Sequence, residues 1–523
     1  MKSSKLIAAI MVASATLFST SCSDDVVDPV VPTPTDDEIE TLSQQAIQEF
    51  LSFAKTPRPG YYDIADRGNL TQARNYLVAW AQKHNYQYEY DEWPNIWIDV
   101  PANSDALASV PKVILQGHID MICASISGES YDYTKVVGEP YYDGDLLKGR
   151  VVNLGSDDGI GVGMALAIAA SDVPHGPLRL LFTANEDYGM DGAINLDPSV
   201  INAEYMINID EEEIGKISNG CLGSYLITFT KQFATSTVSS DKEIGTATVT
   251  GLRGGHSGVM INKGHLSASV VAETFISKAI VPAGGQIISI DCGIGANSIA
   301  NACTVVYAVD KDKADACTMQ IMAESETFQQ NYLDDVNLSI THSDPSGEKA
   351  FSTDMTNYLA SYFSEVTQGV IEQEESGKAT KSNNIGKITA ADGVVTIMDM
   401  FRAYDSQWLE TEKDRFKSLA QKLGATTPDE FPYVPAWSSE GGSKFETLFF
   451  NNYKAVYPDA YTERADGGLE CGYFFLKHPT LKAISVGPQL DDAHSIDEAV
   501  HVSTVKTLMR AIVNTLQHIG EVE

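Results

Sequence analysis

The sequence predicts an α/β protein: a mostly parallel sheet with helices on both faces, interrupted by an inserted α+β domain. Apolar, strand-like runs alternate with helical segments early in the chain, which is typical of parallel sheets buried on both faces. Similar helical and strand-like segments return near the end of the chain, after a middle region whose strands and helices follow a different pattern. At 523 residues the chain is too long for one ordinary domain and suggests two large ones.

The first domain is expected to comprise residues 39–222 and 431–523. Its chain begins with helical periodicity over residues 39–55 and 69–84. Its strand-like runs are residues 95–102, 112–120, 178–186 and 205–213, and helical segments such as 161–173 separate several of them. Ligands of such sheets bind beyond the carboxyl ends of the strands, so polar residues that end these runs are candidate site residues.

The inserted domain is expected to span residues 223–430. Strand-like runs occupy residues 224–234, 246–255 and 285–295, and residues 268–280 and 355–373 show helical spacing. After the insertion, the first domain resumes with a predicted helix at residues 444–453 and a predicted strand at 481–489. No internal repeat and no second apolar run of membrane-spanning length is present.

The charge of the chain is strongly acidic, with 71 Asp and Glu against 36 Lys and Arg and a net charge of −35. This balance argues against nucleic acid or an anionic membrane surface as the main partner. Carboxylates gathered in a cleft would instead attract cations.

The N-terminus predicts export. Lys2 and Lys5 precede an apolar run that is too short to span a membrane, which is typical of a secretory signal. The residues before Cys22 resemble a bacterial lipobox, which implies a signal peptide over residues 1–22, lipidation of Cys22 and a flexible linker over 23–38. The expected location is therefore extracytoplasmic, on the outer membrane or cell surface, with membrane contact only through the lipid anchor. The alternative is cleavage by ordinary signal peptidase. The other six cysteines form no CxxC motif and are expected to be mostly buried thiols.

Histidines and carboxylates gather at the ends of the first domain's strand-like runs and near the far end of the chain. They are His118, Asp120, Asp157, Glu186, Asp187, Asp210 and His494. Such a set suits zinc, or manganese or cobalt, and one carboxylate shared by two ions would explain the excess of acids. Each motif alone has an ordinary explanation. Asp157 and Asp158, for example, stand where helix caps are common.

Together the motifs QGHIDM, NLGSDDGIGV, NEDYGMDGA, INIDEEEIG, GLRGGHSG, GGLECGYF and AHSIDE resemble, in order, those of aminoacyl-histidine dipeptidases. These enzymes belong to the two-zinc aminoacylase and carboxypeptidase superfamily of metallopeptidases. The resemblance runs from about residue 40 to the C-terminus. It implies a zinc-peptidase catalytic domain interrupted by a lid domain.

The resemblance also implies roles for the clustered residues. Asp157 would bridge two zinc ions, His118 and Asp210 would complete one site, and Asp187 and His494 the other. Glu186 would be the general base, and Asp120 would orient His118. Asp158 is then the better candidate for the helix cap. The family usually has Glu-Glu where this chain has Glu186-Asp187. This departure affects which metal is bound and how the second metal site, that of Asp187 and His494, is formed.

Four further residues are candidates for substrate binding. The resemblance suggests that His256 contacts the substrate or polarises the scissile carbonyl, and that Arg402 binds a substrate carboxylate. Glu470 could bind the substrate's α-ammonium group, and Asn297 is a weaker candidate on the lid. The alternatives are an idle histidine in a glycine-rich turn, a surface salt bridge and a buried structural acid.

The function expected is a metal-dependent dipeptidase that hydrolyses short peptides with a free amino end, Xaa-His dipeptides among them. An aminopeptidase or tripeptidase of a neighbouring branch is one alternative, and a noncatalytic peptide-binding surface lipoprotein is another. The glycines at 159, 161 and 163 do not fit GxGxxG, and two adjacent acids would repel a pyrophosphate, so dinucleotide binding is rejected. The lid supports a homodimer in many relatives, but no feature of this sequence decides that point.

Overall fold

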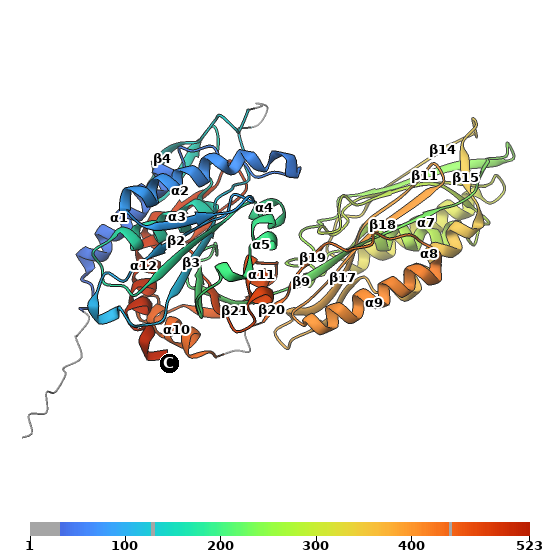
Figure 1. Ribbon diagram of the computed structural model, residues 1–523. Coiled ribbons are helices and arrows are strands. Elements are labelled where there is room, and N and C mark those ends of the chain that lie inside the picture. Colours follow the sequence, from blue (N-terminus) through green and yellow to red (C-terminus); the bar gives the residue numbers. More distant parts are fainter. Residues whose placement is uncertain (1–31, 127–130, 439–441, 523) are drawn as a thin grey trace, which may run out of the picture.

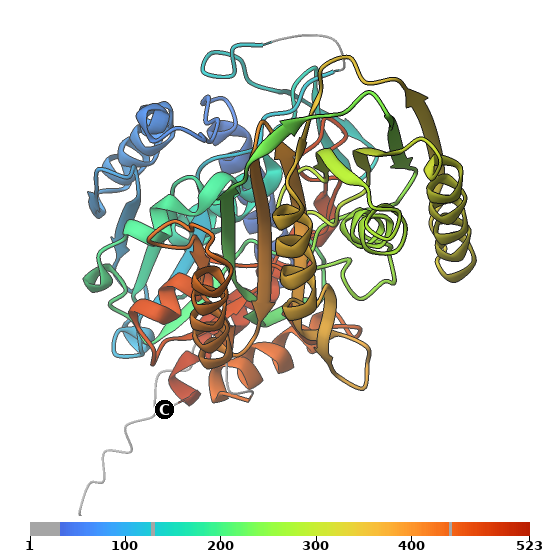
Figure 2. The ribbon, with the colours of Figure 1, turned by 90° about the vertical axis from the view of Figure 1, so that its right-hand side faces the viewer.

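The computed structural model describes residues 32–126, 131–438 and 442–522 of the chain. Figure 1 shows two bodies side by side, and Figure 2 views the second body end-on with the first behind it. The expected signal peptide, the lipidation site Cys22 and most of the expected linker lie outside the described residues.

The first body is built on a nine-stranded sheet with the order β1-β2-β6-β3-β7-β22-β8-β20, and β21 pairs with β8. The central strands β6, β3, β7 and β22 are parallel, whereas β1 and β2 on one side and β20 on the other run antiparallel to their neighbours. The strands are β1 (Gln87–Tyr90), β2 (Ile96–Val100), β3 (Val113–His118), β6 (Leu178–Thr183), β7 (Tyr205–Asn208), β8 (Lys216–Cys221), β20 (Trp437–Ser438), β21 (Tyr461–Ala465) and β22 (Lys482–Ser485).

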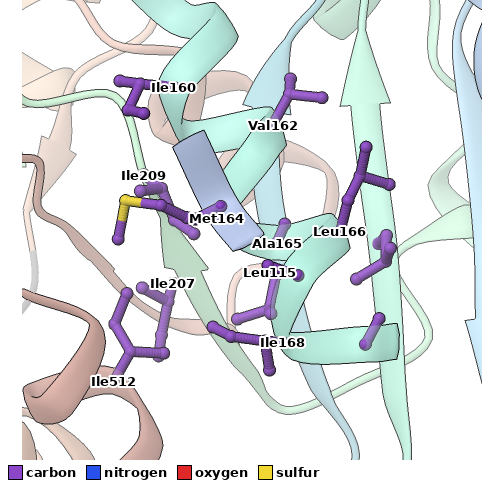
Figure 3. Packing of buried hydrophobic residues seen from close by; sticks show 14 of the residues in the cluster. Leu115, Ile160, Val162, Met164, Ala165, Leu166, Ile168, Ile207, Ile209 and Ile512 are labelled. Carbon is purple, nitrogen blue, oxygen red and sulfur yellow. The ribbon is translucent and has the colours of Figure 1, made fainter. Parts of the chain in front are cut away.

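Helices cover both faces of this sheet. One core contains side chains of α1 (Asp36–Phe53), α2 (Thr71–His84), α3 (Ser156–Ala170), α10 (Lys444–Val456) and α12 (Val502–Gln517), and another contains those of α5 (Asp191–Asn195) and α11 (Glu470–Lys477). Along β3, Val113 and Leu115 join the first core and Ile114 the second, because successive side chains of a strand point to opposite faces. Figure 3 shows α3 packed against Leu115 and Ile207 of the sheet and Ile512 of α12. The expected fold class is confirmed.

A small four-stranded sheet places the far end of the chain beside the start of α3. Its order is β23-β24-β5-β4. The strands are β4 (Glu139–Asp143), β5 (Leu146–Arg150), β23 (Leu490–Asp491) and β24 (Ala499–His501). Because β24 pairs with β5, the loop between β23 and β24 lies close to the turn that leads into α3. Short helical turns complete this body: η1 (Ile64–Leu70), η2 (Asp105–Leu107), α4 (Glu186–Gly189), η3 (Pro198–Val200) and η5 (Ile519–Val522).

The second body, called the lid below, is an antiparallel sheet with the order β14-β11-β13-β12-β17-β18-β9-β19, and β16 pairs with β17. Figure 1 shows α7, α8 and α9 along one face of it. Its strands are β9 (Gly223–Gln232), β11 (Lys242–Thr250), β12 (Gln286–Cys292), β13 (Cys303–Asp310), β14 (Asn337–Ser343), β16 (Gly369–Gln373), β17 (Ala379–Ala391), β18 (Val394–Ala403) and β19 (Tyr433–Val434). Its helices are α6 (Ala268–Phe275), continued by the π-turn η4 (Ile276–Ile280), α7 (Ala314–Asn331), α8 (Thr353–Glu365) and α9 (Ser406–Leu423), and β10 (Thr235–Thr237) pairs with β15 (Lys349–Phe351).

The predicted helix over residues 355–373 is wrong in its last part. Helix α8 ends at Glu365, Val366 is extended, and Gly369 has a φ of +102°. The β-branched Val370 and Ile371 then form β16. The domain boundaries at residues 222 and 430 stay a prediction, and β19 (residues 433–434) still pairs with the lid strand β9.

Two further observations concern the described residues. Their six cysteines are free thiols, five of them buried, as expected. Within residues 32–126, 131–438 and 442–522, no helix combines the length and the apolar character that a membrane span requires.

Candidate metal centre

Three neighbouring parallel strands carry polar side chains to one edge of the first sheet. His118 ends β3, Glu186 and Asp187 follow β6 and begin α4, and Asp210 follows β7. Because β6, β3 and β7 run in the same direction, their carboxyl ends meet at one edge. In Figure 1, α4 lies on the side of the first body that is nearest the lid.

Asp157 stands between two imidazoles. It belongs to the first turn of α3, which follows Gly155 in the left-handed conformation with a φ of +65°. Its Oδ1 lies 3.0 Å from His118 Nε2, and its Oδ2 lies 3.0 Å from His494 Nε2. The two oxygens of one carboxylate therefore face two different histidines.

His494 reaches the cluster from the loop between β23 and β24. Its backbone has a φ of +64°, a conformation that is uncommon for a residue other than glycine. Its Nε2 lies 2.8 Å from Asp187 Oδ1, while Asp210 Oδ1 lies 3.4 Å from His118 Nε2. The aspartate at position 187 is thus long enough to reach its histidine.

The donor atoms fit divalent metal ions. In each of three triads, the ligand atoms lie within 4.8 Å of one another: His118, Asp157 and Asp210; His118, Glu186 and Asp187; Asp157, Asp187 and His494. Two ligands bound tetrahedrally at about 2.1 Å from zinc lie ~3.4 Å apart, which is close to the spacings here. Within the described part of the chain, the buried Asp187 Oδ2 has no hydrogen-bond partner, so a donor atom in the cluster is free for a cation.

The electrostatics of the cluster also favour a cation. Burial raises the pKa of Glu186 well above its usual range, and burial raises that of Asp210 to about 7. The carboxylates of Asp157 and Asp187 accept hydrogen bonds from His494 and raise its pKa to about 11. Burial therefore disfavours charge on these carboxylates, and a bound cation would favour their charged forms.

Two aspartates beside the cluster hold its backbone in place. Asp120 accepts hydrogen bonds from the amides of Glu186 and Asp187 at 3.0 and 3.3 Å, and its Oδ1 lies 3.3 Å from His118 Nδ1. Asp158 accepts from the amides of His118 and Gly161 at 3.1 and 3.2 Å. The N-cap of α3 is Gly155 rather than the expected Asp158, which instead binds an amide inside α3 and ties β3 to that helix.

Glu470, at the start of α11, is buried beneath the cluster. Its Oε2 accepts hydrogen bonds from Gln116 Nε2 and Thr183 Oγ1, both at 2.7 Å, while Oε1 has no partner. Burial raises the pKa of Glu470 to about 8.

The remaining candidates lie together on the lid. His256 Nε2 lies 3.5 Å from Arg402 Nη2, and the amide of Ser257 donates to the Asn297 carbonyl at 2.8 Å. Burial and the Arg402 charge lower the pKa of His256 to about 4. Among the described residues, no hydrogen bond or ion pair joins His256, Arg402 or Asn297 to the metal cluster, so the structure brings these three together but leaves them apart from it.

Sequence reasoning missed three residues that support the cluster: Arg58, Asn185 and Glu498. Asn185 has a φ of +61° and holds the backbone of Tyr61 with both side-chain atoms, which orients the chain entering α4. An Asn before paired acids is a usable signal, because Asn is enriched in this conformation. Arg58 carries no local signal, since its contacts are with segments distant in sequence, whereas Glu498 ends the AHSIDE motif without having been given a role.

Imidazoles and carboxylates gathered at the carboxyl edge of a parallel sheet are the kind of donor set that metal-dependent hydrolases use. The chain is 30% identical over 477 residues to the cytosol non-specific dipeptidase of Escherichia coli, a likeness covering 90% of this chain and 96% of that one. It therefore belongs to the aminoacyl-histidine dipeptidase branch of the metallopeptidases. No family model matches the chain.

Solved structures agree with this assignment. The aminoacylhistidine dipeptidase of Vibrio alginolyticus is 25% identical with a TM-score of 0.76, over 92% of this chain and 97% of that one. A tripeptidase of Staphylococcus aureus, 15% identical with a TM-score of 0.52 over 92% and 99%, shares the fold.

The expected location is wrong. The Escherichia coli relative that matches 90% of this chain is named as a cytosolic enzyme, which contradicts an extracytoplasmic, lipid-anchored protein. The expectation rested on a short apolar run and Cys22, in residues outside the described part, whereas the likeness covers most of the chain. A short apolar run is a compositional signal that other N-termini share, so the signal peptide and lipid anchor are not carried further.

Proposed function

We propose that this protein is a dizinc dipeptidase that hydrolyses short peptides with a free amino end, Xaa-His dipeptides among them. The observation that carries the proposal is the position of Asp157, whose two oxygens each lie 3.0 Å from a different imidazole. A carboxylate placed in this way is suited to bridging two ions. Manganese or cobalt would suit the same donors.

The cluster divides into two sets of ligands around the shared Asp157. His118 and Asp210 would hold one ion, and Asp187 and His494 the other. Bound ions of this kind supply Lewis acidity, which polarises a carbonyl and lowers the pKa of water. Asp120 keeps the His118 ring oriented and fixes the backbone amides that place Glu186 and Asp187.

Glu186 is the general base of the proposed reaction. Its carboxylate lies in the triad with His118 and Asp187, yet neither ligand set of the proposal needs it. Burial raises its pKa well above the usual range, which suits a group that takes a proton from water and returns it to the leaving amine. This spare acid also argues against a noncatalytic peptide-binding protein.

The lid residues and Glu470 would bind the two ends of the substrate. Arg402 would hold the substrate carboxylate, and Glu470 would face the α-ammonium group. His256 is neutral at pH 7 because its pKa is about 4. Its Nδ1 accepts from the amides of Gly258 and Val259, both at 3.3 Å, which would leave Nε2 to donate to the scissile carbonyl once the ring is turned from Arg402 Nη2, now 3.5 Å away. Asn297 would lie on the same side of the substrate as His256 and Arg402.

A homodimer formed through the lid is part of the proposal. An apolar hollow of about 140 Å³ lies between η4 and α8, lined by Ile276, Val281, Leu359 and Phe363 among others. Sedimentation of the purified protein would test it.

The test of the function is a peptide panel combined with metal analysis. We expect two equivalents of metal per chain, cleavage of dipeptides, loss of activity on chelation and recovery when Zn²⁺, Mn²⁺ or Co²⁺ returns. Preferred cleavage of tri- or tetrapeptides would instead favour the aminopeptidase or tripeptidase alternative. Metal-independent cleavage would reject the mechanism.

A further inference from the structure

Arg58, in the chain that follows α1, is a buried cation that the proposed mechanism does not use. Its side chain is 1% exposed, and among the described residues no ion pair joins it to a carboxylate. Its guanidinium donates instead to four backbone carbonyls. Nη1 donates to Ile119 O at 3.4 Å and Asp120 O at 2.7 Å, and Nη2 donates to Leu154 O at 3.1 Å and to Gly155 O.

These four carbonyls belong to the two turns that carry the central ligands. Ile119 and Asp120 directly follow His118, while Leu154 and Gly155 lie just before Asp157. One planar group thus spans the backbone on both sides of the His118–Asp157 contact. Lysine could not replace it, because a single ammonium lacks the fork of donors needed to reach both turns.

The surrounding chain is shaped to admit a guanidinium. A Cβ on Gly155 would lie 2.5 Å from Arg58 Nη2, and a Cβ on Gly159 would lie 2.6 Å from it. The Phe53 ring stacks beneath the guanidinium carbon at 4.9 Å. Any residue larger than glycine at position 155 or 159 would push Arg58 away from the carbonyls.

Glu498 connects a third loop, the one between β23 and β24 that carries His494, to these two turns. This buried carboxylate accepts a hydrogen bond from the amide of Ser156 at 3.0 Å, and it is the strongest of the negative charges that act on Arg58. Glu498 follows His494 in the same loop between β23 and β24. Glu498 therefore ties the His494 loop to the turn before Asp157, whose carbonyls accept hydrogen bonds from Arg58.

We propose that Arg58 is a positioning residue that holds the His118 and Asp157 turns at the spacing a shared metal ligand requires. The inference rests on the proposed function for its metal chemistry. A buried cation without a carboxylate at ion-pair distance is costly to remove from water. Arg58 is thus costly as a purely structural residue, and its contacts all converge on the ligand-bearing backbone.

The experiment compares Arg58→Lys and Arg58→Met with Arg179→Met. Arg179 is a matched control, because it is also a buried arginine of the first body, paired with Asp99 and donating to Val200 O. Each protein is prepared metal-free. Its thermal midpoint, its affinity for Zn²⁺ by chelator competition and its Co²⁺ absorption spectrum are then measured, together with hydrogen exchange of residues 119–121 and 154–158.

We expect both Arg58 variants to lose about 10- to 100-fold in metal affinity, the range found when groups that orient metal ligands are removed. Their Co²⁺ spectra should change, and exchange at both turns should be faster in the metal-free state. Arg179→Met should lower the thermal midpoint without these effects. The Arg58→Lys variant keeps the charge and most of the volume, so it tests the fork of donors if Arg58→Met fails to fold.

The proposal is overturned if the Arg58 variants bind metal within twofold of the wild type with an unchanged Co²⁺ spectrum, whatever their thermal midpoints. It is also overturned if exchange at the two turns is unaltered. A wild-type protein that takes up no metal would reject the proposed function, and the exchange comparison of metal-free proteins would still decide the role of Arg58.

Discussion

Adjacent carboxylates at positions 157 and 158 have separate structural roles. Asp157 faces two imidazoles, whereas Asp158 accepts the amides of His118 and Gly161. Likewise, Glu186 and Asp187 follow one another, but only Asp187 contacts His494. Neighbouring residues can therefore have different roles: Asp157 and Asp187 are proposed metal ligands, whereas Asp158 and Glu186 are not. The short turns that carry these pairs point consecutive side chains in different directions.

At this scale, Glu186→Gln should abolish most turnover while metal content stays unchanged. An amide keeps the size of the side chain but cannot take a proton from water, so kcat should fall by about 10²- to 10⁴-fold. Steady-state kinetics and elemental analysis measure the two effects. Glu204→Gln, at an exposed glutamate of the same body, is the control and should leave both unchanged. Full activity in Glu186→Gln would show that another group is the base.

At the scale of the elements, the lid places a buried acid between a strand and a helix. Asp399 of β18 is fully buried and accepts a hydrogen bond from Tyr362 of α8. Burial raises the pKa of Asp399 to about 7. The folded lid thus holds a proton that the unfolded chain, with an ordinary aspartate pKa near ~3.9, releases at much lower pH.

The stability that comes from this proton should be complete below pH ~4 and should be lost as the pH rises through about 7. Three units of pKa correspond to at most ~4 kcal/mol of unfolding free energy. Asp399→Asn should therefore flatten the decline in thermal midpoint between pH 5 and pH 8.5. Asp392→Asn, at the exposed turn between β17 and β18, should leave the wild-type decline in place. Equal slopes for the two variants would contradict the assignment.

In the molecule as a whole, charged contacts link the lid to the first body. Lys378 of the lid lies 3.0 Å from Glu463 and 3.2 Å from Asp466, and Tyr404 Oη donates to Asp466 Oδ1 at 3.1 Å. Asp466 leads into the loop before Glu470, and its charge also acts on His256. This junction therefore connects the lid residues with the chain that enters the metal centre.

Lys378→Met should weaken substrate binding without removing the metal. Freed from Glu463 and Asp466, the lid would hold His256 and Arg402 less accurately, and misplacement of about 1 Å can cost ~100-fold in rate. We expect kcat/KM to fall about 10- to 100-fold, mainly through KM, with unchanged metal content. Lys381→Met, which removes an ion pair internal to the lid with Glu372, is the matched control. Identical kinetics in the two variants would rule out this role for the junction.

Features of the fold that depend on local sequence could be predicted, whereas those that depend on contacts between distant segments could not. The strands β2, β3, β6 and β7 and the helices α1 and α2 follow from apolar periodicity, a local property of the chain. Helix α8 was predicted too long because helical spacing in residues 366–373 competes with β-branched residues that pair with β17 only in the folded lid. The location was wrong because it depended on the N-terminal residues alone.

By itself, the sequence determined the α/β fold class and predicted which residues gather at the sheet edge as candidate metal ligands, because strand ends and their motifs lie within short segments. Only the tertiary structure showed that Asp157 lies between His118 and His494, that Asp187 is long enough to reach His494, and that Arg58 spans two turns. Those relations join residues tens to hundreds of positions apart. No local pattern encodes such distances, since they arise when the sheet and its helices pack around one edge.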